Sequence, residues 1–157
     1  MSNTIETVEN PHELLAQLRT LIEEHKNKRI VVMGTTCTGK TTLLKDIPDA
    51  HDMDELVFPL LSREESDYVC QTPWTPEIGK TMTRLTRERV KVEPGKPVFG
   101  TVLLSCDLII YLHISDEVLK KRTIARDTNF SDAKNMQSAI EKEIAVSKTP
   151  VIRVTVG

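Results

Sequence analysis

Glycine, threonine and lysine gather in one short segment of the chain, residues 34–42, which reads GTTCTGKTT between two apolar stretches. Gly34 and Gly39 allow a tight turn that brings consecutive backbone N–H groups toward a polyphosphate. Lys40 and Thr41 follow the second glycine and complete the pattern G-x-x-x-x-G-K-[ST]. Because the segment follows a strand-like run and precedes a helical one, it predicts a site for a nucleoside triphosphate.

The pattern also assigns roles within the segment. We expect Lys40 to reach the β- and γ-phosphates of ATP and the Thr41 hydroxyl to ligate Mg²⁺. A GTP-specific site would usually carry the motif N-K-x-D. The nearest tetrapeptide, NKRI, lacks the aspartate. The sequence still leaves the choice between ATP and GTP open. The expected nucleotide-binding residues are Gly34, Thr35, Thr36, Cys37, Thr38, Gly39, Lys40, Thr41 and Thr42.

Two carboxylates follow as candidates for the chemistry itself. Asp52 and Asp54 lie two positions apart at the expected end of the second strand, so they would face the same side if that segment is extended. One could hold a magnesium-bound water, and the other could accept the proton of an attacking hydroxyl. We expect Asp54 to be the catalytic base and Asp52 to serve the metal and the substrate, with the reverse assignment and a solvated acidic turn as alternatives.

A basic helical face is the candidate site for the second substrate. Within a helix expected over residues 75–91, Lys80, Arg84 and Arg87 recur at spacings of four and three, which places them on one face. Such cations could pair with a carboxylate or phosphate, and Trp74, the only tryptophan, could stack on a base or sugar. A packed tryptophan beside a solvated basic face is the alternative. We expect these residues to bind a small anionic acceptor.

The hydrophobic pattern predicts the framework that positions these side chains. Apolar spacing and start signals predict helices over residues 10–26, 40–45, 75–91 and 115–126, and a last one around 136–144. Apolar runs predict strands at 30–33, 97–104, 107–114 and 150–156, and residues 49–56 form a brief strand or loop. The expected fold is α/β, with a central five-stranded, mostly parallel sheet that has helices on both faces and carries residues 34–40 at its carboxyl edge.

Composition narrows the function classes. The 157 residues, 39% hydrophobic and 28% charged, fit a single globular domain over 1–157. A formal net charge of −2 gives no overall basic field, which argues against nucleic acid as a partner. Three cysteines without paired spacing favour a reducing, cytoplasmic compartment, and no apolar run is long enough to span a membrane. The oligomeric state stays open.

Three segments together resemble the small P-loop kinases of metabolites and nucleosides, such as shikimate, gluconate and uridine kinases. These segments are GTTCTGKTT, DMD and LIIYLHISDEVLKKRTIARD, in that order. The resemblance implies a P-loop NTPase domain built as a three-layer sandwich, which transfers the γ-phosphoryl group of Mg-ATP. It also implies a short mobile lid over about 122–132, in which Arg122 and Arg126 of an R-x-x-x-R-D run reach over the phosphates and act in catalysis.

The chain also departs from that pattern. The D-G-[FY]-P-R stretch of adenylate-kinase-like enzymes is missing, and the corresponding region reads VFGTVLLSCDL. The acceptor pocket is expected in residues 62–92, the longest part without a phosphate-binding role, and the acceptor is a small metabolite, nucleoside or nucleotide. Two other functions stay open: a nucleotide-binding switch or assembly NTPase with slow hydrolysis, and a polynucleotide 5′-kinase.

Overall fold

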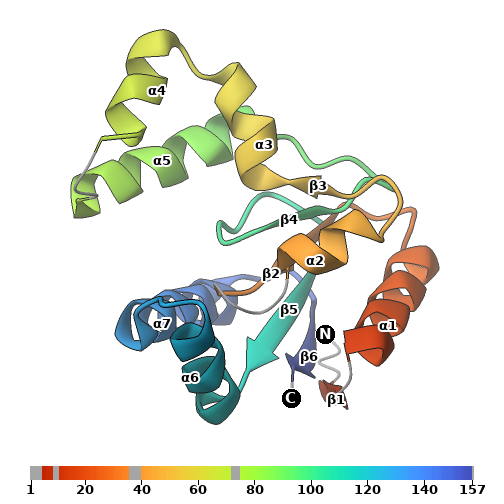
Figure 1. Ribbon diagram of the computed structural model, residues 1–157. Helices are drawn as coiled ribbons and strands as arrows, with labels where there is room; N and C mark the ends of the chain where they lie inside the picture. Colours follow the sequence, from red (N-terminus) through yellow and green to blue (C-terminus); the bar gives the residue numbers. More distant parts are fainter. Residues whose placement is uncertain (1–4, 9–10, 36–39, 72–74, 157) are drawn as a thin grey trace.

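The computed structural model describes residues 5–8, 11–35, 40–71 and 75–156 (Figure 1). Its strands are β1 (Ile5–Val8), β2 (Ile30–Met33), β3 (His51–Asp52), β4 (Val98–Gly100), β5 (Leu108–Ile114) and β6 (Val151–Val156). Its helices are α1 (Pro11–Glu24), α2 (Lys40–Lys45), α3 (Met53–Val57), the 3₁₀ turn η1 (Phe58–Leu60), α4 (Arg63–Val69), α5 (Pro76–Arg89), α6 (Asp116–Ala125) and α7 (Phe130–Val146).

All the strands of this part of the chain join one sheet. The strand order is β1-β6-β5-β2-β4-β3, and every neighbouring pair is parallel. The α/β class and the five expected strands are therefore confirmed. The sixth strand, β1, was not expected, because its four residues have two adjacent polar side chains between two apolar ones and lack the alternation of a half-buried strand. It pairs along the outer edge of β6.

Helices cover both faces of this sheet, as the near-continuous apolar strands predict. In β2, Ile30 and Val32 belong to a hydrophobic cluster that includes residues of α1, α2 and α6. Val31 and Met33 point the other way, into a cluster that includes residues of α3 and α7. All four β2 side chains are at most 1% exposed, so this strand lies at the centre of the fold.

Most helix boundaries follow from local signals. The Ser115 hydroxyl accepts a hydrogen bond from the Val118 N–H at 3.3 Å and begins α6. At α5, Thr75 caps the Ile78 N–H at 3.2 Å and Pro76 occupies the first helical position. The short helix α2 ends at Lys45, three residues before Pro48, as predicted.

The connection between β4 and β5 carries no helix. These strands lie on either side of β2, and only residues 101–107 link them. The expected strand over 97–104 is reduced to Val98–Gly100, and Leu104 is buried in the cluster on the α7 face. Gly100 is required for packing, since a Cβ there would overlap the Met53 side chain. With only this segment between them, α5 and α7 lie on the same face of the sheet, where both contribute residues to one hydrophobic cluster (Figure 1).

Candidate functional site

The strand order creates a switch point at the carboxyl ends of β2 and β5. The chain leaves β2 toward β3 on one side of the sheet and leaves the adjacent strand β5 toward β6 on the other. In open α/β sheets, ligands bind in the crevice that such diverging connections leave. Gly34 follows β2 directly, so the predicted phosphate-binding segment leaves the sheet at this point.

Two hydrogen bonds hold the start of that segment. Thr35 is fully buried, and its hydroxyl donates to the Ala133 carbonyl of α7 at 2.7 Å. The Gly34 N–H donates to the Gly100 carbonyl at the end of β4 at 3.4 Å. The start of the segment is therefore fixed by two elements that are distant in sequence. The remaining predicted residues, Thr36, Cys37, Thr38 and Gly39 and the side chains of Lys40, Thr41 and Thr42, lie outside the described part.

A buried amide lies one helical turn farther along α7. Gln137 is fully buried, and its Oε1 accepts a hydrogen bond from the backbone N–H of Ile114, the last residue of β5, at 3.3 Å. Its Nε2 has no hydrogen-bond partner in the described part of the chain. Helix α7 thus contacts the residues at which the chain leaves both β2 and β5.

The aspartate pair is arranged differently from our expectation. Asp52 ends β3, but Asp54 belongs to helix α3, so the two side chains do not share one face of an extended strand. Asp52 instead caps α3, its Oδ1 accepting the Asp54 N–H at 2.8 Å. Helix α3 begins at Met53 because this side chain is buried in the core, where it packs against Gly100. Strand β4 also lies between β3 and β2, so Asp52 ends a strand that is not adjacent to β2.

The predicted lid segment, residues 122–132, contains the last turn of α6, a reversal of the chain and the start of α7. Arg122 lies half-buried in α6, Arg126 is the exposed residue at which that helix ends, and α7 begins four residues later. Asp127 adopts a positive φ of 53° to reverse the chain. An ion pair of 2.6 Å between Lys134 and Asp116 joins the two helices. Both arginines therefore belong to the connection that leaves β5 at the switch point, and movement of this segment as a lid stays a prediction.

The basic face of α5 borders a cavity. Lys80, Arg84 and Arg87 share one face of the helix as predicted, and the cavity beside them measures about 620 Å³. Glu143 of α7 also lines this cavity. Trp74 lies outside the described residues. The residues that line the cavity are Pro76, Gly79, Lys80, Thr83, Arg84, Arg87, Glu88 and Glu143.

Two of these three cations already have carboxylate partners. Arg84 contacts Glu88 of the same helix at 3.3 Å in an exposed pair. Arg87 contacts Glu143 at 3.0 Å and donates from Nε to the Leu103 carbonyl at 3.2 Å, so it connects α5 to α7 and to the 101–107 segment. In the described part of the chain, only Lys80 among the three lacks a side-chain partner.

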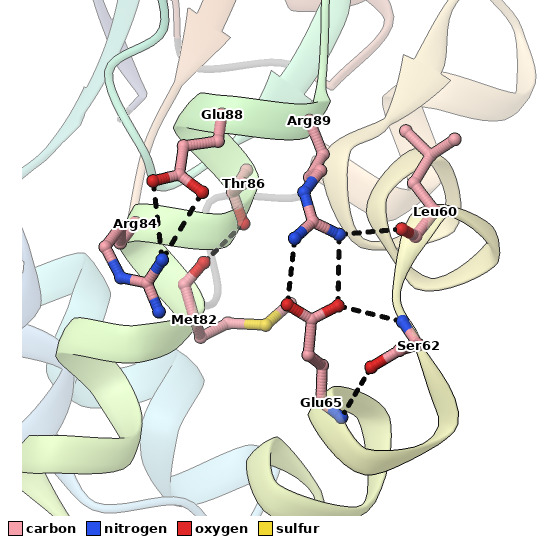
Figure 2. A network of polar contacts seen from close by, with 8 residues as sticks. All are labelled: Leu60, Ser62, Glu65, Met82, Arg84, Thr86, Glu88 and Arg89. Carbon is pink, nitrogen blue, oxygen red and sulfur yellow. Dashed lines mark hydrogen bonds and ion pairs between the residues drawn. The ribbon is translucent and has the colours of Figure 1, made fainter.

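A second ion-pair network fixes the helix pair α4–α5, which contains most of the expected acceptor segment (Figure 2). The Arg89 guanidinium makes two parallel bonds to Glu65, at 3.0 and 2.8 Å, and a third to the Leu60 carbonyl at 2.9 Å. Glu65 also closes a capping box with Ser62. Hydrogen bonds from Arg89 and then from the Ser62 N–H lower the pKa of Glu65 to about 2.

Some contributors to this region were not identified from the sequence. Gln137 occupies the buried stripe of α7 between Ala133, Ile140 and Ile144, and a polar residue at that apolar spacing was the available signal. Glu143 gave no comparable signal, since it is one of several charged residues on α7. Its importance comes from Arg87, which lies 56 positions away in sequence.

Metal binding, membrane crossing and similarity to known proteins were also tested. In the described ranges, no three histidine, cysteine, aspartate or glutamate residues come together as a metal-binding group. None of the helices there has both the length and the apolar character needed to cross a bilayer. The chain matches no known protein-family model, and a search of curated proteins found no relative.

Proposed function

We propose that the protein is a P-loop phosphotransferase that moves the γ-phosphoryl group of Mg-ATP to a small anionic acceptor. One observation carries the proposal: the pattern G-x-x-x-x-G-K-T begins at the end of the central strand β2, at the switch point of a parallel sheet, and α2 begins at its lysine. A chance match to the pattern would have no reason to occur at this position.

The surroundings of the switch point fit a nucleotide and its metal. Residues 34–42 would hold the phosphates, with Lys40 on the β- and γ-phosphates and Thr41 on Mg²⁺, which neutralises charge on the transferred group. Arg122 and Arg126 belong to the connection that leaves β5 at the same edge. There they would stabilise the charge that develops during transfer.

The candidate base is linked to the same region through packing. Met53 packs against Gly100, and the Gly100 carbonyl accepts the Gly34 N–H. Asp54 follows Met53 and is exposed in the first turn of α3. We retain Asp54 as the proposed base, and Asp52 caps α3 through its bond to the Asp54 N–H.

The cavity between α5 and Glu143 is the proposed acceptor site. Lys80 provides the cation for an anionic group, because its ammonium group is not engaged by a side chain in the described part of the chain. Arg84 and Arg87 would contribute by forming the wall of the cavity, since each is already paired with a carboxylate.

The test combines nucleotide binding with an acceptor screen. Lys40→Ala should weaken Mg-ATP binding about 100-fold or more, since a cation beside the phosphates is lost. Lys45→Ala, an exposed lysine at the end of the same helix, is the matched control and should leave binding unchanged. ADP release is then measured across sugars, nucleosides and nucleoside monophosphates. Release that depends on one acceptor supports a kinase, slow release without any acceptor dependence supports a switch NTPase, and unchanged binding in Lys40→Ala overturns the nucleotide site.

A further inference from the structure

Gln137 is a buried polar side chain with only one end of its amide hydrogen-bonded in the described part of the chain. The residue is fully buried, and its Nε2 has no partner in the described part of the chain. A buried donor without a partner loses its bonds to water and gains nothing in return. Such groups are rare in folded proteins, and each one calls for an explanation, such as a functional role.

The orientation of this amide is fixed by its other end. The oxygen and nitrogen of a glutamine amide can be exchanged only if both orientations satisfy their neighbours. Here the neighbour is the Ile114 N–H, a donor, which lies 3.3 Å from Oε1. Reversing the amide would set two donors against each other, so the group without a partner is the Nε2 donor.

The position of Gln137 connects it to the switch point. Ala133 and Gln137 are four residues apart and share one face of α7. The Ala133 carbonyl accepts from Thr35, the second residue of the phosphate-binding segment, and Gln137 binds the last residue of β5, where the connection to α6 begins. One face of α7 therefore fixes both chain segments that leave the switch point.

We infer that Gln137 is a positioning residue for the nucleotide site: its Nε2 donates to an oxygen acceptor that is in place only when the nucleotide is bound. The inference rests on the proposed function in taking the ligand to be a nucleoside polyphosphate. The Nε2 donor is already removed from water in the free protein, so its desolvation does not oppose nucleotide binding. A hydrogen bond formed by this donor would therefore make nucleotide binding tighter.

The direct test follows the side-chain amide of Gln137 in the wild-type protein by ¹H–¹⁵N NMR. The signal is assigned by its loss in Gln137→Met. On addition of Mg-ADP we expect this signal to shift and its hydrogen exchange to slow, while Mg²⁺ alone leaves it in place. Movement of backbone signals around Gly34 without any change at Gln137 would overturn the inference but leave the nucleotide site intact. A spectrum that does not respond to Mg-ADP anywhere would overturn the proposed function together with the inference.

A second measurement separates positioning from a general structural role. Gln137→Met removes both the donor and the acceptor at similar length, and Gln17→Met in α1 is the matched control. We expect the Kd for Mg-ADP to rise about tenfold in Gln137→Met, the size of one hydrogen bond, and to stay within twofold in Gln17→Met. The melting temperature without nucleotide is recorded for both variants. A lower melting temperature with an unchanged Kd would show that Gln137 only stabilises the fold.

Discussion

The proposed nucleotide and acceptor regions are held together by different kinds of contact. At the switch point, Thr35 and Gln137 are fully buried and bind backbone groups of distant elements. In the helix pair α4–α5, ion pairs predominate, and the side chains of Arg89 and Glu65 are 34% and 28% exposed. The hydrophobic cluster of that pair has only three buried members, Val69, Ile78 and Leu85.

This difference indicates which region can adjust. Buried hydrogen bonds to backbone tolerate little displacement, because a broken bond leaves a buried group without a partner. Ion pairs that are open to solvent, such as Arg84–Glu88, contribute only about 0–1 kcal/mol each and re-form easily in water. We therefore expect a fixed site for the phosphates and an adaptable site for the acceptor. Four predictions test this contrast.

The largest effect is expected at the proposed base. Asp54→Asn should lower kcat about 100-fold or more, because an amide cannot accept the proton of the attacking hydroxyl. Binding of Mg-ATP should stay within about threefold. The comparison variant is Asp52→Asn, whose amide oxygen can still cap α3. Steady-state kinetics with direct binding measurements distinguish the two, and an equal loss of kcat in both variants would refute the assignment of a single base to Asp54.

The fixed character of the phosphate region is tested at Thr35. Thr35→Val keeps the shape of the side chain but leaves the Ala133 carbonyl without its buried 2.7 Å bond. We expect the free energy of unfolding to fall by about 1–3 kcal/mol. Thr35→Ser retains the hydroxyl and should recover most of this bond. Urea denaturation provides the measurement, and a Val variant as stable as the wild type would show that this contact does not fix the segment.

The acceptor region is tested with a pair of cations one turn apart. Lys80→Met should raise the KM for the acceptor about tenfold, since its ammonium group is available to an anion. In Arg84→Met the change should stay near twofold, because Glu88 already engages that guanidinium. The KM for ATP is the internal control for both variants. A larger effect at Arg84 than at Lys80 would mean that the Arg84–Glu88 pair opens for the substrate.

The smallest effect concerns pH. The pKa of Glu65 is lowered to about 2 by Arg89 and by the Ser62 N–H, from a usual value of 4.5. A lowered carboxyl pKa stabilises the folded state above the usual pKa, and this contribution is lost as the pH falls through the folded-state value. The helix pair α4–α5 should therefore lose this contribution between about pH 4.5 and pH 2. Carbon NMR titration of the Glu65 carboxyl should give a midpoint near 2 in the wild type and nearer 4.5 in Arg89→Met. Equal midpoints would show that Arg89 does not control this group.

The sequence predicted those parts of the fold that depend on local patterns. The buried strand β5 and the capped helices α5 and α6 were expected at nearly their observed positions. The helix start at Met53 was missed because packing against Gly100, 47 positions later, takes Met53 into the core, and no local pattern encodes that contact. The edge strand β1 was missed for a related reason, since its pairing partner is at the other end of the chain.

The candidate site was predictable to a similar degree. The residue types and spacing of segment 34–42 were sufficient to predict that it begins at the carboxyl end of a strand, and Gly34 does follow β2 directly. The ion-pair partners of the basic face were not predictable. Lys80, Arg84 and Arg87 were all expected to bind the acceptor, but Glu143 and the Leu103 carbonyl engage Arg87 from other elements. Spacing along one helix cannot reveal such partners.

The pairing of β1 with β6 has a consequence for the order of assembly. Residues 5–8 are synthesised well before residues 153–156, which are their hydrogen-bonding partners. Contacts between such distant segments form late, because the entropy of closing the intervening loop must be overcome first. We therefore expect β2, β4 and β5 to associate first and the pairing of β1 with β6 to form after them.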